Sequence, residues 1–212
     1  MTSHPRHPLH RPIQHLFARM LARSGDLDRR YYGARRRRLL SPLRGRVLEL
    51  GPGTGTNLAY LPADVEWIGV EPNEYMHPYI RRQAEDVGRA IDLRAAPAEA
   101  LDLPDGSVDA VVGTLVLCSV DDPQRVLSEV RRVLRPGGQF VFIEHVASPD
   151  GSARRRMQDV TQPLVTFFGD GCHPNRATLE TIERAGFRDL DVEHFSVPAW
   201  IVGPHIAGAA TL

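Results

Sequence analysis

Residues 47–57 read VLELGPGTGTN, a short apolar strand that runs directly into a glycine-rich turn. Four more apolar strands are predicted along the chain, at 67–70 (WIGV), 91–95 (IDLRA), 108–117 (VDAVVGTLVL) and 139–146 (QFVFIEHV). Helical stretches lie between them, at 74–89 and at about 123–134, the second of which we expect proline and glycine to stop at 135–138 (RPGG). Strands that alternate with helices and are almost wholly apolar predict a parallel sheet covered on both faces.

The end of the chain has a different pattern. The apolar stretches 187–195 (FRDLDVEHF) and 199–212 (AWIVGPHIAGAATL) are separated by only three residues, 196–198. A parallel crossover needs a dozen or more residues, so these two stretches must pair as an antiparallel hairpin. We therefore predict an α/β fold with one domain, a doubly wound, Rossmann-like sheet that ends in an antiparallel hairpin.

Composition excludes several classes of protein. The chain has 212 residues, 42% hydrophobic and 25% charged, as expected for one globular domain. Lys+Arg and Asp+Glu both number 26, so no net positive charge favours nucleic acid as a partner. Two cysteines, Cys118 and Cys172, are too few for a disulfide framework or a four-ligand zinc site. His173 beside Cys172 has no further ligands near it in the sequence, so we predict no metal site.

The N-terminal part separates into two segments. Residues 1–11 alternate Pro, His and Arg without periodicity, which predicts a disordered arm. Residues 12–42 predict a helical lead-in to the main domain at 43–212. The four arginines at 35–38 point around all sides of a helix, which favours a solvated surface over a phosphate- or membrane-binding patch. No stretch resembles a signal peptide or a membrane span. We expect a cytoplasmic protein, and peripheral membrane contact stays open.

The glycine-rich turn is the expected ligand site. In a doubly wound sheet, ligands bind beyond the carboxyl ends of the strands. Gly51, Gly53 and Gly55 allow a tight turn and close approach of a ligand to bare backbone. The dinucleotide pattern G-x-G-x-x-G is broken, because Thr56 and Leu58 stand where its third glycine would be.

Two acids near the turn narrow the choice of ligand. Glu49 would repel a pyrophosphate, but it could receive the ammonium of an amino-acid moiety, directly or through water. Glu71 follows the second strand, about 20 residues past the first glycine, which is the usual place for an acid that binds both ribose hydroxyls. Together they favour S-adenosylmethionine over NAD.

With these motifs the chain resembles the class I S-adenosylmethionine-dependent methyltransferases. The resemblance rests on the strand with its GPGTG turn, on 69–73 (GVEPN), on 103–112 (LPDGSVDAVV) and on 131–145 (RRVLRPGGQFVFIEH). It implies a seven-stranded sheet in the order 3-2-1-4-5-7-6 with strand 7 antiparallel. The expected cofactor-binding residues are Glu49, Gly51, Pro52, Gly53, Thr54, Gly55, Asn57, Glu71, Pro72, Asn73, Ala98, Glu99, Thr114 and Leu115.

A narrower resemblance extends beyond the cofactor motifs. TLVLCSV (114–120), GDGC (169–172), ETIERAGF (180–187) and GPHIAG (203–208) resemble a mammalian group of membrane-associated thiol S-methyltransferases and related bacterial proteins. Three departures matter. The resemblance implies a hydrophobic anchor at the start of the mammalian proteins, and no stretch of this sequence resembles one. Glu71 stands where their acid is usually aspartate. Many relatives have an acid for the adenine amino group after the third strand, and Glu99 is the candidate for that contact.

The resemblance implies an in-line methyl transfer to a small molecule, in which orientation of the reactants supplies most of the effect. His145, at the end of the fifth strand, is the candidate base, with a structural histidine as the alternative. Asp170 is a second candidate for a catalytic role. Cys118 is expected to be a packed residue rather than a nucleophile. Phe167 and Phe168 suggest an apolar acceptor pocket, although core aromatics fit the same pattern.

The sequence leaves the acceptor open. A thiol is one candidate, because a few per cent of a thiol with a pKa of ~8.5 is already ionised at neutral pH. The alternatives are O-, C- or N-methylation of a quinone, a phenolic metabolite or a phospholipid headgroup. A non-catalytic adenosylmethionine-binding module and an NAD-dependent reductase are further alternatives. The sequence indicates no oligomeric state.

Overall fold

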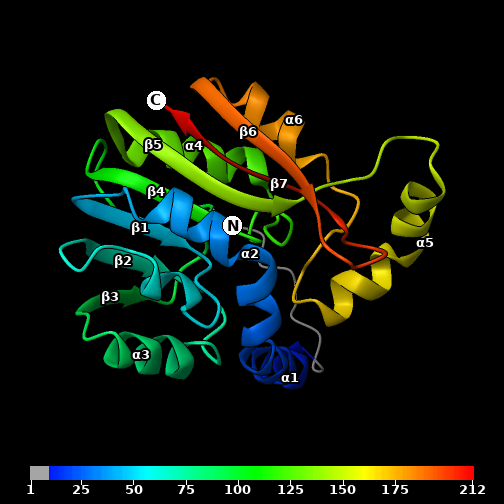
Figure 1. Ribbon diagram of the computed structural model, residues 1–212, viewed down its shortest axis with the longest axis horizontal. Helices are drawn as coiled ribbons and strands as arrows, with labels where there is room; N and C mark the ends of the chain where they lie inside the picture. Colours follow the sequence, from blue (N-terminus) through cyan, green and yellow to red (C-terminus); the bar gives the residue numbers. More distant parts are fainter. Residues whose placement is uncertain (1–9) are drawn as a thin grey trace.

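The computed structural model describes residues 10–212 as a seven-stranded sheet with helices on both faces (Figure 1). The strand order is β3-β2-β1-β4-β5-β7-β6. β7 runs antiparallel to both of its neighbours, and the other neighbouring pairs are parallel. The predicted fold class is confirmed. The strands are β1 (Arg46–Leu50), β2 (Glu66–Val70), β3 (Ile91–Arg94), β4 (Val108–Thr114), β5 (Leu134–His145), β6 (Arg188–Ser196) and β7 (Pro204–Thr211).

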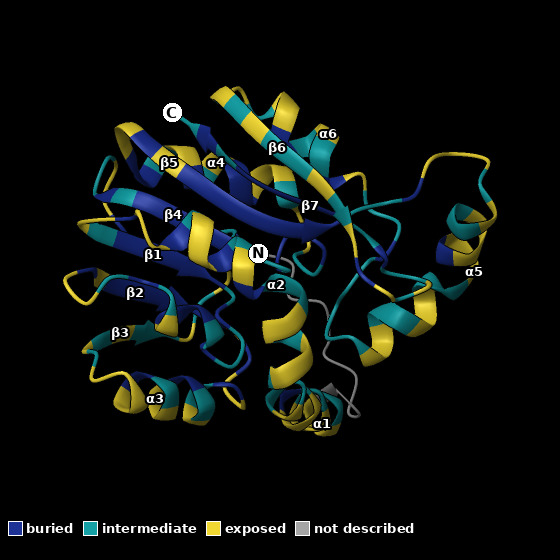
Figure 2. Cartoon of the chain, in the orientation of Figure 1, coloured by how far each residue is buried: buried dark blue, intermediate teal, exposed yellow. Residues whose placement is uncertain are grey.

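A separate apolar core lies on each face of the sheet, and the central strands are the most deeply buried part of the chain (Figure 2). One core contains residues of α4 (Pro123–Val133) and α6 (Thr178–Arg184). The other contains residues of α1 (His10–Arg23), α2 (Gly25–Leu40), the 3₁₀ turn η1 (Thr56–Ala59) and α3 (His77–Asp86). Burial on both faces explains why these strands are continuous apolar runs.

Local sequence signals explain where α4 begins and which side it buries. The side chain of Asp122 accepts hydrogen bonds from the backbone N–H groups of Gln124 and Arg125, and Pro123 occupies the first turn. Both features are favoured at a helix N-terminus. The buried residues of the helix recur at helical spacing and form one apolar stripe: Val126, Leu127, Val130 and Val133.

The structure differs from the sequence prediction at 135–138. Helix α4 ends at Val133, within one residue of the predicted end, but residues 135–138 belong to β5, which begins at Leu134 rather than at Gln139. Val108 pairs with Leu134, whereas Ala110 pairs with Gln139. The extra residues on β5 form a bulge, which accommodates proline and glycine inside a strand. The glycine-rich turn leads into only the short η1 before the chain continues to β2.

The N-terminal segment packs against the main domain. Most of the arm predicted at residues 1–11 lies outside the described residues, and α1 begins at His10, inside that range. The four arginines do not form a uniformly solvated surface: Arg36 is buried, and Arg35 and Arg38 both pair with Glu193 of β6. Only Arg37 fits the expectation of an exposed residue without a partner among those described.

A helix that the sequence analysis did not predict, α5 (Ala153–Phe168), stands apart from the sheet (Figure 1). Its interior proline, Pro163, and its polar first half obscure the helical pattern. Val160, Leu164 and Phe168 are exposed on it. Among residues 10–212, no helix combines the length and the apolar character that crossing a membrane requires. The predicted cytoplasmic location stays a prediction.

Candidate functional site

A cavity of about 790 Å³ opens at the carboxyl ends of β1, β2, β4 and β5. Residues of the glycine-rich turn form one wall, and α1 and α2 contribute Gln14, Leu21 and Asp28 to another. The loop that follows α5 contributes Asp170 and Cys172. The cavity therefore lies where ligands of doubly wound sheets bind, and segments from both ends of the chain enclose it.

The glycine-rich turn has a backbone that favours glycine. Gly51, Gly53 and Gly55 have φ values of 53°, 58° and 79°, in the left-handed region. A Cβ atom on Gly51 would lie 2.7 Å from Cγ2 of Val116, so a side chain there would also clash. Gly53 faces the cavity, whereas Gly55 precedes η1 and lies beneath the cavity wall, against α3.

Glu71 directs a buried carboxylate toward the cavity. Oε2 accepts a hydrogen bond of 3.0 Å from the backbone N–H of Gly53, and Oε1 accepts one of 2.9 Å from that of Asn73. Burial raises the pKa of this carboxyl group to about 7, against these two hydrogen bonds. Each oxygen keeps a second lone pair for a ligand. The acid predicted to bind a ribose is thus held in place by the turn itself.

Glu49 is buried at the base of the cavity and already has two donors. Its Oε1 accepts from Nδ2 of Asn57 at 2.9 Å, and its Oε2 accepts from Nε1 of Trp67 at 2.8 Å. Burial raises the pKa of Glu49 despite these hydrogen bonds. Nδ2 of Asn57 also donates to Oγ1 of Thr114, at 3.0 Å. The sequence analysis missed Trp67, because an apolar strand position gave no signal of a buried donor.

Oδ1 of Asn57 is buried without a hydrogen-bond partner among residues 10–212. Buried acceptors in native proteins are rarely left unpaired. Asn57 lines the cavity, so a ligand with a polar hydrogen could supply the missing donor.

Asp170 lines the cavity close to Glu71 and links three segments. Nδ2 of Asn73 donates to its Oδ2 at 2.8 Å, and Nε2 of Gln14 donates to its Oδ1 at 3.2 Å. Asn73 thus supports both Glu71 and Asp170, although it does not line the cavity itself. Asp170 has a φ of 49°, which is uncommon for a non-glycine residue.

The α2 helix contributes a buried ion pair to the same cavity. The guanidinium of Arg36 contacts the carboxylate of Asp28, and Arg36 is only 4% exposed. Arg36 is the one arginine or lysine among the described residues that line the cavity, and besides its partner Asp28 five further acids line it: Glu49, Glu71, Glu99, Asp121 and Asp170. A cavity of this kind favours a positively charged ligand.

The chain turns sharply out of the sheet after β4. Leu115 has a φ of 55° and donates its N–H to the carbonyl of Ile143. The next two backbone N–H groups, of Val116 and Leu117, both donate to Oε1 of buried Glu144. This turn lies against the cavity and directs Cys118 toward the end of β5.

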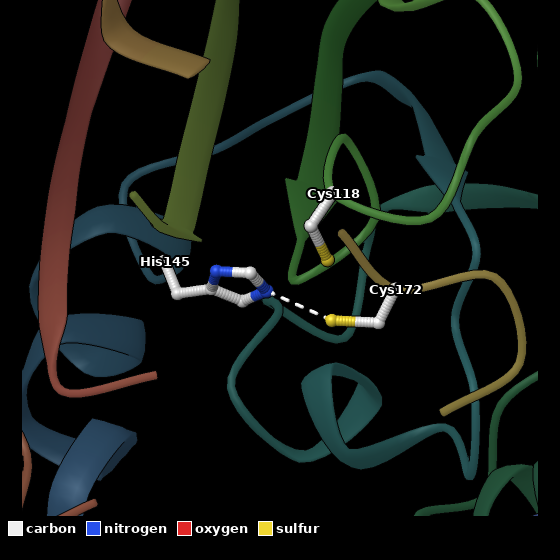
Figure 3. Close-up of side chains that lie close together, drawn as sticks. All are labelled: Cys118, His145 and Cys172. Atoms are coloured by element: carbon white, nitrogen blue, oxygen red, sulfur yellow. Dashed lines mark hydrogen bonds between the residues drawn. The ribbon is translucent and has the colours of Figure 1, made fainter. Parts of the chain in front are cut away.

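Cys118, His145 and Cys172 converge at one end of the cavity (Figure 3). Their ligand atoms all lie within 4.8 Å of one another, and Nε2 of His145 is 3.1 Å from Sγ of Cys172. The thiol of Cys172 holds the pKa of Cys118 well below its usual range, and the pKa of Cys172 rises in turn. Burial opposes charge on His145, yet the pKa of His145 rises because Cys118 is beside it. Sequence reasoning treated the three residues separately.

The structure brings most of the predicted site residues to this cavity; only Gly55 and Asn73 lie outside its lining. Ala98 and Glu99 line it, and Oε1 of Glu99 accepts from the backbone N–H of Asp121. Both interpretations of Phe167 and Phe168, an apolar acceptor pocket and buried core aromatics, are wrong, because both side chains are exposed and neither lines the cavity. Their rings contact each other outside it, 44% and 52% exposed.

Comparisons with known proteins identify relatives of this chain. A family model described as a methyltransferase domain matches residues 48–142. Human thiol S-methyltransferase TMT1B is 40% identical over 191 residues, which cover 84% of this chain and 78% of that protein. Demethylmenaquinone methyltransferase of Clavibacter sepedonicus is 32% identical, covering 79% and 75%. A solved S-adenosylmethionine-dependent methyltransferase from Thermotoga maritima is similar in fold, with a TM-score of 0.68, 24% identity, and coverage of 94% and 98%.

Proposed function

Because this chain belongs to the S-adenosylmethionine-dependent methyltransferase family and uses that cofactor, we propose that it transfers the methyl group to the sulfur of a small-molecule thiol. The similarity to human thiol S-methyltransferase TMT1B, over most of both chains, carries this proposal. Thiol S-methyltransferase TMT1A of the same species is 38% identical over 77% of this chain. The cavity supports it with a cofactor end and a separate acceptor end.

The residues of the cofactor end fit S-adenosylmethionine. Glu71 offers two anchored carboxylate oxygens to the ribose hydroxyls, and the bare backbone at Gly51 and Gly53 leaves room for the amino-acid moiety. Oδ1 of Asn57 is a buried acceptor for an ammonium group. Glu49 holds Asn57 in place and has a further lone pair on each oxygen. The acidic lining suits a cofactor that carries a sulfonium.

When bound, the cofactor supplies a methyl group that its sulfonium already activates. The tasks left to the chain are to hold the acceptor in line and to exclude water. Cys118, His145 and Cys172 form the acceptor end, and the apolar residues Val165 and Val202 also line the cavity. An apolar wall next to polar sulfur and nitrogen atoms suits a small lipophilic thiol.

A second candidate is C-methylation of a quinone ring. The relative from Clavibacter sepedonicus carries the name demethylmenaquinone methyltransferase and matches this chain over most of its length. On such a substrate His145 would act as the base predicted from the sequence. Its Nε2 would then have to leave Cys172, which it contacts at 3.1 Å.

The test is methyl transfer from labelled S-adenosylmethionine by the purified protein to matched alkyl thiols, phenols, amines and a demethylated quinone. We expect label on the thiols only. Label on the quinone alone would replace the thiol by the second candidate. A Gly53→Arg variant should lose cofactor binding, because its side chain would enter the cavity. The matched control is Gly88→Arg, another positive-φ position, with no atom within 4 Å of an added Cβ. Cofactor binding without transfer to any acceptor would favour the binding-module alternative.

A further inference from the structure

Three side chains that commonly bind metals, Cys118, His145 and Cys172, meet at the acceptor end (Figure 3). His145 ends β5, and Cys118 lies in the turn after the neighbouring β4, so the sheet places both at the same edge. Cys172 comes from the distant loop after α5. In Figure 3 the three side chains point toward one another from three separate segments.

The loop that carries Cys172 is fixed against the turn after β4. The backbone N–H of His173 donates to the carbonyl of Cys118 at 2.8 Å. Gly171 has a φ of 91°, and a Cβ atom there would lie 2.8 Å from the carbonyl oxygen of Ser119. The close approach of the two segments therefore favours glycine at 171, and it places Cys172 beside Cys118. The contact between these two loops holds the two sulfur atoms within 4.8 Å of each other.

The side chains are the ligands that zinc prefers. Two cysteines and one histidine form a known catalytic zinc set, in which a fourth position stays open for water or substrate. Bonds of about 2.3 Å to sulfur and 2.0 Å to nitrogen in a tetrahedron place ligand atoms roughly 3.5–3.8 Å apart. Here Nε2 lies 3.1 Å from Sγ of Cys172, and all three ligand atoms lie within 4.8 Å. Small side-chain shifts would bring them to that spacing.

We propose that Cys118, His145 and Cys172 bind one Zn²⁺ ion whose open fourth position takes the sulfur of the acceptor thiol. The inference rests on the proposed function, because it names what holds the acceptor. All three residues line the cavity that also contains Glu71 and the glycine-rich turn, so the open position faces the cofactor end. His145 is then a zinc ligand rather than a base.

The chemistry balances without a redox partner. The acceptor R–SH binds the zinc through sulfur and releases its proton to water, because a thiol that coordinates zinc is deprotonated. The acceptor sulfur then forms a bond to the methyl carbon, and the bond between that carbon and the cofactor sulfur breaks. The bonding electron pair returns to the cofactor sulfur. The thioether product is a weaker ligand than the thiolate, which favours its release.

The first experiment measures metal content. The full chain, reduced with a phosphine, is incubated with Zn²⁺ and passed through gel filtration, and zinc per chain is determined by mass spectrometry. We expect about one zinc per chain, and a loss of most of it in Cys118→Ser, Cys172→Ser and His145→Ala. The matched control is His194→Ala, a histidine exposed on β6, which should keep its zinc. Circular dichroism establishes that each variant is folded.

Cobalt substitution tests the coordination and the open position without catalysis. Co²⁺ in the site should give thiolate-to-metal charge-transfer absorption that is missing in Cys118→Ser and Cys172→Ser. Propanethiol, added without S-adenosylmethionine, should change this spectrum, whereas propanol should not. Substoichiometric zinc in the reduced wild-type chain, or full zinc in all three variants, would overturn the proposal. A disulfide between the two cysteines in place of metal would overturn it too.

The outcomes separate this proposal from the proposed function. If zinc-free protein methylates propanethiol as fast as the zinc-loaded protein, the metal role is wrong and the thiol specificity stands. If zinc binds as expected but no thiol changes the cobalt spectrum or accepts label, the site holds a metal and the acceptor is wrong.

Discussion

Replacing Glu71 by glutamine gives the sharpest test of the cofactor site. The carboxylate is anchored by the N–H groups of Gly53 and Asn73, and each oxygen has one lone pair left for a ribose hydroxyl. Glutamine keeps the shape but offers one acceptor oxygen, so one hydroxyl loses its acceptor. A hydrogen bond to a charged group contributes ~1.5–3 kcal/mol, which corresponds to roughly a 10- to 150-fold loss of affinity.

The folded state should not weaken in parallel. Burial raises the pKa of Glu71 to about 7, so above that pH the ionised group lowers the stability of the ligand-free protein. Replacing Glu71 by glutamine removes this loss of stability, which is of the order of 3 kcal/mol. The same replacement leaves one backbone N–H without an acceptor, which lowers the stability by about 1–3 kcal/mol. The two effects oppose each other, and the unfolding free energy at pH 8 should change little.

The assay is isothermal titration with S-adenosylhomocysteine at pH 8, alongside urea unfolding of the free proteins. The matched control is Glu74→Gln, which changes an exposed acid three residues along the chain and should bind normally. A Glu71→Gln protein that binds within about twofold of the wild type would refute the ribose role, because a lost charged hydrogen bond cannot cost so little.

Three further predictions follow from the same geometry. Cofactor affinity of the wild type should weaken as pH falls through about 7, by roughly tenfold between pH 8 and pH 6, because protonation of Glu71 removes an acceptor. The affinity of the Glu71→Gln variant should not change over this range, and a wild-type affinity independent of pH would contradict the prediction. Gly51→Ala should lower the free energy of unfolding in urea by about 2 kcal/mol or more, because φ is 53° and the new Cβ would lie 2.7 Å from Val116. Gly88→Ala, with a similar φ and open space around it, should lower it by about 1 kcal/mol. Equal losses would show that the contact with Val116 is irrelevant. Arg36→Ala should lower the free energy of unfolding by about 3–5 kcal/mol, because it leaves the carboxylate of Asp28 half-buried and unpaired. Arg37→Ala, at an exposed position, should change it by no more than ~0.5 kcal/mol. Similar values for the two variants would mean that the ion pair does not stabilise the fold.

The fold and the cofactor end could be predicted because their signals lie in short stretches of sequence. Apolar strands, a broken dinucleotide pattern and the acid Glu71 all lie within short stretches of sequence, and the structure places them at one sheet edge. The bulge at 135–138 escaped prediction, because proline and glycine ordinarily end an element, and only the register between β4 and β5 reveals that the strand continues through them.

The acceptor end could not be predicted from spacing. Cys118, His145 and Cys172 come from three segments far apart in the sequence, and their approach depends on tertiary contacts such as that of Gly171 with Ser119. Taken alone, Cys118 was interpreted as a packed cysteine, His145 as a base and Cys172 as a metal ligand without partners, and each interpretation was reasonable. A metal motif shows in sequence when its ligands share a loop or a helix, and these share neither.

The N-terminal helices belong to the site, although their sequence suggested a solvated lead-in. Arg36 is buried in a cavity-lining ion pair, and Tyr32 of the same helix lies 2.9 Å from His205 of β7 through its hydroxyl. Gln14 of α1 donates to Asp170, two residues before Cys172. Helix α1, which lines the cofactor end, is therefore hydrogen-bonded to the loop that carries Cys172, a proposed zinc ligand. Because α1 contacts that loop, a substitution in either segment should change the affinity for both the cofactor and the acceptor. Both affinities should therefore be measured for every variant in these segments.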